Sequence, residues 1–92
     1  MDLYKALHEM RRLSEKNTPF EFTFMSCNLT KADSQGVVHV SRGRLLSREV
    51  KKRHRHAEMV EWYINLDTMQ IRHFYQPLLM TFNGLKVDFN ED

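Results

Sequence analysis

The sequence predicts an α+β fold in a single domain, residues 1–92. Apolar residues repeat at helical spacing up to about residue 16, and from residue 18 onward the spacing changes to two, the period of a strand. The length of 92 residues allows one modest core, because two cores would leave each half too small to fold unaided. We therefore expect an N-terminal amphipathic helix followed by an antiparallel β-meander of five or six strands.

The predicted helix begins near Asp2, a side chain that can cap it, and ends near residue 16. Pro19 supports this end, because a proline disfavours helical geometry at the residue before it, Thr18. The apolar face is formed by residues three or four apart, namely Leu3, Leu7, Met10 and Leu13.

The first two predicted strands follow the helix. Phenylalanines at 20, 22 and 24 alternate with polar residues, which indicates a half-buried strand. Residues 28–36 are polar and predict an exposed connection. Val38 and Val40 begin a second strand that continues to about residue 46 after a bend at Gly43. Residues 47–57 are mostly polar or basic and predict a long loop or ribbon tip.

Two hairpins are predicted in the second half of the chain. Residues 60–66 and 69–74 alternate in polarity around a turn at Asp67-Thr68, and Gln76-Pro77 then interrupts the ladder, because proline has no N–H to donate. Residues 78–82 and 85–89 flank Asn83-Gly84, a pair that tolerates the positive φ angles of a type I′ turn.

We expect the strands to twist strongly or to close into a small SH3-like or OB-like barrel, since a chain this short has little else to cover its sheet edges. The helix would then cover one face or one open end. The residues expected in the core are Leu7, Met10, Phe22, Trp62, Ile64 and Phe82.

The charge distribution is the most unusual feature of the sequence. Residues 42–56 carry a formal charge of +6, whereas the rest of the chain carries −4, for a net charge of +2. The seven cations of this basic segment are Arg42, Arg44, Arg48, Lys51, Lys52, Arg53 and Arg55.

Clustered arginines and lysines gain affinity for nucleic acid by releasing its condensed counterions, so the basic segment predicts a phosphate-contacting site. Tyr63, Phe74 and Tyr75, on or beside the faces opposite the expected core, are candidates for stacking on single-stranded bases. The alternative is that the segment is a solvated loop and that the chain is a virion or assembly component acting through protein–protein contacts, either with a protein partner or as a homo-oligomer.

No catalytic arrangement is recognisable. Cys27 has no activating residues beside it, and the three glycines lie too far apart for a phosphate-binding loop. The acids Glu58 and Glu61 flank the start of the third predicted strand, next to the basic segment, and are expected to relieve its repulsion. The sequence therefore predicts no enzyme and no small-molecule substrate.

Metal binding is also not expected. His54 and His56 would share one face of a strand, but the cations around them oppose a divalent ion. We expect no metal and no cofactor. A single cysteine cannot form an intramolecular disulfide, which favours a reducing compartment, and no apolar run exceeds three residues, which argues against a membrane span.

Three stretches of the sequence carry a resemblance to known proteins: 18–28 (TPFEFTFMSCN), 37–40 (VVHV) and 79–87 (LMTFNGLKV). Together with the opening helix, they resemble small uncharacterised proteins encoded by bacteriophages and prophages of gut Bacteroidetes, which vary in their polar middle stretch. The resemblance implies a setting in the bacterial cytoplasm or the virion. It also implies a non-enzymatic role, either on nucleic acid or in particle assembly.

Overall fold

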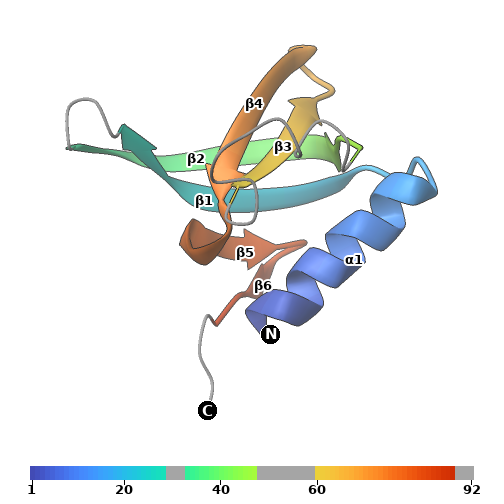
Figure 1. The fold of residues 1–92 in the computed structure, drawn as a ribbon, viewed down its shortest axis with the longest axis horizontal. Coiled ribbons are helices and arrows are strands. Elements are labelled where there is room, and N and C mark those ends of the chain that lie inside the picture. The colour runs from blue at the N-terminus through green and yellow to red at the C-terminus, as the bar shows by residue number, and fades with distance from the viewer. Residues whose placement is uncertain (29–32, 48–59, 89–92) are drawn as a thin grey trace.

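In the computed structural model, which describes residues 1–28, 33–47 and 60–88, one helix packs against a six-stranded antiparallel sheet (Figure 1). This confirms the α+β class. The elements are α1 (Leu3–Glu15), β1 (Phe20–Asn28), β2 (Asp33–Leu45), β3 (Val60–Asn65), β4 (Gln70–Tyr75), the short 3-10 helix η1 (Gln76–Leu78), β5 (Leu79–Phe82) and β6 (Leu85–Lys86).

Helix α1 begins and ends where the sequence predicts. The Asp2 carboxylate accepts a hydrogen bond from the backbone N–H of Lys5 at 3.2 Å and so caps the first turn. After the last turn Asn17 adopts a φ of 57°, a left-handed conformation that ends many helices. Leu3, Ala6 and Met10 are buried on the side that faces the sheet.

The strands lie in the order β4-β3-β2-β1-β5-β6. The first four strands form the predicted meander. The last hairpin departs from it, because η1, which carries Pro77 in its first turn, interrupts the ladder after β4 and β5 then pairs with the other side of β1. Figure 1 shows β3 and β4 rising steeply from β1 and β2.

The predicted SH3-like or OB-like barrel is wrong, because the sheet is open. β4 and β6 lie at opposite ends of the strand order and do not pair with each other. β6 has only two residues, and the N-terminal segment occupies the position beyond it: Asp2 bridges to Asp88, and the N–H of Leu3 donates to the Asp88 carbonyl at 3.0 Å. The sheet thus covers that edge with its own N-terminal segment instead of closing on β4.

The core lies between α1 and the sheet face that we call the inner face. Phe22 is fully buried at its centre, with four aromatic rings whose centroids lie 5.1–6.0 Å from its own. These rings belong to Phe20, Phe24, Tyr63 and Phe74. The predicted burial of Met10, Phe22 and Phe82 is confirmed, whereas Leu7 is only partly buried against the core.

The prediction for β3 and β4 assigned the two faces the wrong way round. Tyr63 and Phe74 are each only 2% exposed and belong to the core, whereas Trp62 and Ile64 are partly buried on the opposite face. Tyr63 lies opposite buried Leu45 of β2, and this pairing places it on the inner face, where its ring packs against Phe22 and Phe24. Both rows of the alternation carry large apolar side chains, so the period of two did not identify the buried row.

The predicted turns are present in the described residues. Asn83 and Gly84 both have positive φ angles, 49° and 84°, as a type I′ turn requires. The register of β1 with β2 shifts between the pairs Phe20–Gly43 and Phe22–Val40, which is the bend expected at Gly43. The first connection is shorter than predicted, because the strands reach Asn28 and resume at Asp33. The predicted loop lies, from residue 48 onward, outside the described residues.

Candidate nucleic-acid interface

The sheet face turned away from α1, which we call the outer face, has two different halves. Over β1, β2 and β5 it is mostly polar, although Val37 is 57% exposed there. There His39 contacts the Glu21 carboxylate at 2.6 Å, and the hydroxyls of Thr23 and Thr81 share a hydrogen bond of 2.7 Å. Over β3 and β4 the outer face carries aromatic and aliphatic side chains.

Three residues of this second half form what we call the aromatic strip: Trp62, His73 and Tyr75. Trp62 lies directly opposite His73 in the β3–β4 ladder, and their ring centroids are 4.8 Å apart. Tyr75 follows His73 on the same face, with centroids 6.0 Å apart and an interplanar angle of 84°. His73 is exposed, and the other two are partly exposed. Of the predicted stacking residues Tyr63, Phe74 and Tyr75, only Tyr75 lies on this face.

Two cations of the basic segment lie beside the aromatic strip. Arg44 of β2 is directly opposite Ile64, the next outer-face residue along β3 from Trp62, and Arg42 lies two positions before Arg44 on the same face. Arg44 donates to the side-chain oxygen of Asn17 at 3.0 Å, and Arg42 donates to the Asp67 carboxylate at 3.2 Å. The Arg42 side chain is 59% exposed.

The other five cations of the predicted site, Arg48, Lys51, Lys52, Arg53 and Arg55, lie outside the described residues. The chain that contains them leaves the described structure after Ser47 and returns at Val60. Both ends adjoin Trp62: the N–H of Leu46 donates to the Trp62 carbonyl at 2.9 Å, and Val60 is two residues before Trp62 on β3. Chain connectivity therefore ties both ends of this stretch to the neighbourhood of the aromatic strip.

A buried ion pair that the sequence did not predict lies on the inner face. Arg11 of α1 contacts the Glu61 carboxylate at 3.0 Å, with side chains only 14% and 6% exposed. Arg11 also donates to the Leu46 carbonyl at 2.6 Å, and Gln76 donates to the second Glu61 oxygen at 2.8 Å. Glu61 was expected to relieve the repulsion of the basic segment, whereas its carboxylate pairs with Arg11. The sequence signal for this ion pair was the position of Arg11, which lies four residues after Leu7, at the border of the apolar face of the helix.

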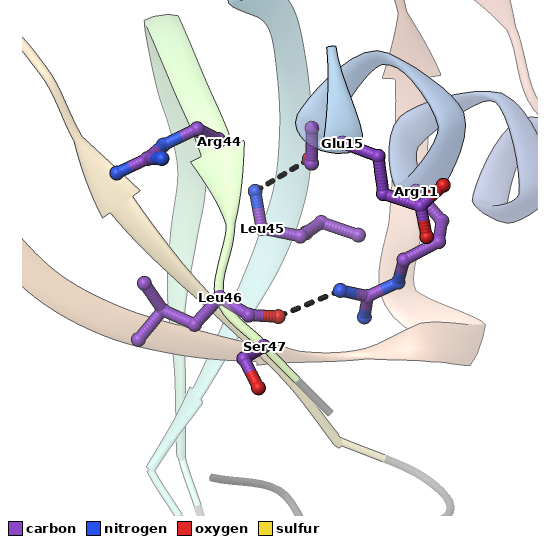
Figure 2. Close-up of a pocket in the computed structure, with 7 residues that line it drawn as sticks. Arg11, Glu15, Arg44, Leu45, Leu46 and Ser47 are labelled. Atoms are coloured by element: carbon purple, nitrogen blue, oxygen red, sulfur yellow. Dashed lines mark hydrogen bonds between the residues drawn. The ribbon is translucent and has the colours of Figure 1, made fainter. Parts of the chain in front are cut away.

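A cavity of about 410 Å³ lies between the end of α1 and the end of β2. Figure 2 shows Arg11 reaching across it to the Leu46 carbonyl, while Arg44 points away. The Ser14 hydroxyl donates to the Met10 carbonyl and accepts from the Leu45 N–H, so it serves the local backbone and not a reaction. Glu15 shares the lining with both arginines, and this mixture of charges favours neither an anion nor a cation.

In residues 1–28, 33–47 and 60–88, no three histidine, cysteine or acidic side chains gather in a way that could hold a metal ion. No helix in this part of the chain is long and apolar enough to cross a membrane. Comparison with protein-family models, curated proteins and solved structures finds no match.

Proposed function

We propose that this chain binds nucleic acid electrostatically through the basic segment, residues 42–56, and has a non-enzymatic role. The observation that carries the proposal is the position of Arg42 and Arg44, which lie on the same sheet face as the aromatic strip. Cations beside exposed aromatic rings are the combination that nucleic-acid surfaces use for phosphates and bases. The resemblance to phage-encoded proteins supports the same role and a setting in the bacterial cytoplasm or the virion.

The contacts that Arg42 and Arg44 already make do not oppose the proposal. The Arg42–Asp67 pair is exposed on both sides, and exposed ion pairs contribute only about 0–1 kcal/mol. A phosphate can therefore replace Asp67 at little cost. Binding of this kind depends on charge and not on base sequence, so the affinity should fall steeply as the salt concentration rises.

The test is a fluorescence titration of labelled oligonucleotides with the full chain at two or more salt concentrations. If four of the seven cations contact phosphates, log K for a single strand should fall with a slope of about −3 against log salt. Replacing Lys51, Lys52, Arg53 and Arg55 by serine should remove most of the affinity. Thermal stability should change little, because exposed charges contribute little to folding.

A matched control removes the same number of cations elsewhere. Lys5, Arg12, Lys16 and Lys86 are all exposed and lie outside the basic segment. The variant with these four residues replaced by serine should keep the slope and most of the affinity. Equal losses in the two variants would mean that only net charge matters. Wild-type affinity weaker than about 10⁻⁴ M at low salt would contradict the proposal.

A second candidate function, assembly through protein–protein contacts, is favoured by the outer edge of β4, with which no strand in the described part of the chain pairs. The Leu46–Trp62 hydrogen bond shows that the Trp62 backbone faces β2, so by alternation Tyr63 bonds to Arg72 on β4 and Ile71 points outward. Consistently, the Ile71 carbonyl accepts from the Arg72 guanidinium, and the Ile71 side chain is 51% exposed. An outward edge of this kind can pair with a strand of another chain.

Ile71→Pro tests this candidate, because proline removes the outward N–H without removing a β3–β4 bond. If the chain assembles through β4, light scattering should show association of the wild type that survives high salt and is lost in the variant. Arg72→Pro is the control for folding, since it removes an inward N–H and should destabilise the domain itself. A wild type that remains monomeric at high concentration and brings no partner through purification would contradict assembly.

A further inference from the structure

We infer that the aromatic strip stacks on unpaired nucleobases, so that the chain prefers single-stranded nucleic acid to duplex. This inference rests on the proposed function and adds the kind of nucleic acid that is bound. Trp62, His73 and Tyr75 project from two adjacent strands on one face, with neighbouring ring centroids 4.8 and 6.0 Å apart. They form a continuous aromatic surface.

The β3–β4 ladder holds the three side chains of the aromatic strip in place. Trp62 and His73 are direct cross-strand partners, and Tyr75 lies opposite Val60, whose side chain is only 6% exposed. Side chains held in a ladder lose little further freedom when a ligand covers them. His73 is exposed and Trp62 and Tyr75 are partly exposed, so each ring offers some surface to a ligand.

The arginines near the aromatic strip favour nucleic acid as its ligand. Arg44 lies diagonally across the ladder from Trp62, at about 7–8 Å in ordinary sheet geometry, and Arg42 continues the same row. A strand of nucleic acid lying across this face can place phosphates near the arginines and bases on the rings. A duplex can satisfy only the first contact, because its bases are stacked and paired with one another. The stacking contribution should therefore appear only with single strands.

Trp62 gives a direct readout, because it is the only tryptophan in the chain. The full chain is titrated with an oligodeoxythymidine and, separately, with a duplex of similar length, while intrinsic fluorescence is followed. We expect Trp62 emission to be quenched by the single strand and to change little with the duplex. His73→Ala and Tyr75→Ala should each weaken single-strand binding by about 5- to 150-fold, the equivalent of about 1–3 kcal/mol per stacked base. Duplex binding and the salt slope should not change.

Tyr4→Ala is the matched control, since Tyr4 is 67% exposed on α1, away from the strip. Its single-strand affinity should equal that of the wild type. Salt-dependent binding with no quenching, and with His73→Ala and Tyr75→Ala indistinguishable from the wild type, would overturn the inference and leave the proposed function standing. A wild type that binds neither ligand would overturn both. His73 is exposed, so its variant remains informative even if Tyr75→Ala loses stability.

Discussion

The inner face of this sheet and the outer face over β3 and β4 both carry large apolar side chains but differ in how far these are buried. On the inner face Phe22 is fully buried beneath α1 and among other aromatic rings. On the outer face Ile71 remains 51% exposed and Trp62 partly so, although both lie in regular ladders. The comparison shows that packing against Phe22 and Phe24 of β1 decides which row of β3 and β4 becomes core.

The largest expected difference between the faces is the effect of removing one aromatic ring from each. Phe22→Ala should lower the free energy of unfolding by about 3–5 kcal/mol, since it opens a cavity in the centre of the core. Trp62→Ala should cost less than about 2 kcal/mol, because that ring is already partly in water. Urea denaturation followed by circular dichroism measures both, and similar losses would mean that the outer face is also core.

The same comparison explains how much of the fold the sequence could predict. Phe20, Phe22 and Phe24 alternate with polar residues, so their buried face was unambiguous and was predicted correctly. On β3 the alternation sets Trp62 and Ile64 against Tyr63, with large side chains in both rows. Choosing between the rows requires the pairing of Tyr63 with Leu45, which is a tertiary fact. The open sheet was missed because the N-terminal segment protects the β6 edge without closure.

The next largest effect should come from the buried ion pair that fixes α1 to the inner face. Glu61→Ala should cost about 3 kcal/mol, because it leaves the Arg11 guanidinium without its carboxylate in a nearly dry position. Replacing Arg11 by methionine and Glu61 by leucine together should restore most of the loss, since no charge then remains buried. Thermal denaturation of the single and double variants makes this test, and a harmless Glu61→Ala would show that the pair is solvated.

The candidate site was predicted only in part, for a related reason. Arg42 and Arg44 were identified from charge density alone, which is visible in the sequence, and both lie on the outer face. The aromatic residues of the candidate site depend on which row of alternate side chains on β3 and β4 lies on the outer face. Trp62 and His73 were therefore missed, and Tyr63 and Phe74, both core residues, were included wrongly.

A smaller effect is expected at Gly43, where β2 comes very close to the core. A Cβ at this position would lie 2.7 Å from the Phe22 ring and 3.1 Å from Val40. Gly43→Ala should therefore destabilise the domain by about 1–3 kcal/mol through overpacking. Ser41→Ala, at an exposed position in the same strand, is the control and should be nearly neutral. A neutral Gly43→Ala would mean that the Phe22 ring can move aside easily.

The smallest expected effect is the contribution of the Tyr63 phenol to the pH dependence of stability. It tests whether Tyr63 lies on the inner face. Burial raises the pKa of Tyr63 above its usual value of about 10, and the positive charge of Arg72 offsets part of the rise. Below about pH 10 the phenol is protonated in both the folded and unfolded chains, so it adds no pH dependence. As the pH rises further, the unfolded chain loses this proton first, and stability falls until the folded pKa is passed. Denaturation midpoints measured from pH 8 to 11 should therefore fall less steeply in Tyr63→Phe than in the wild type.

Tyr4→Phe, on the exposed side of α1, should follow the wild-type curve. Arg72→Ala should steepen the fall, because the cation that moderates the shift is gone. Identical curves for Tyr63→Phe and the wild type would place this phenol in water and return Tyr63 to the outer face.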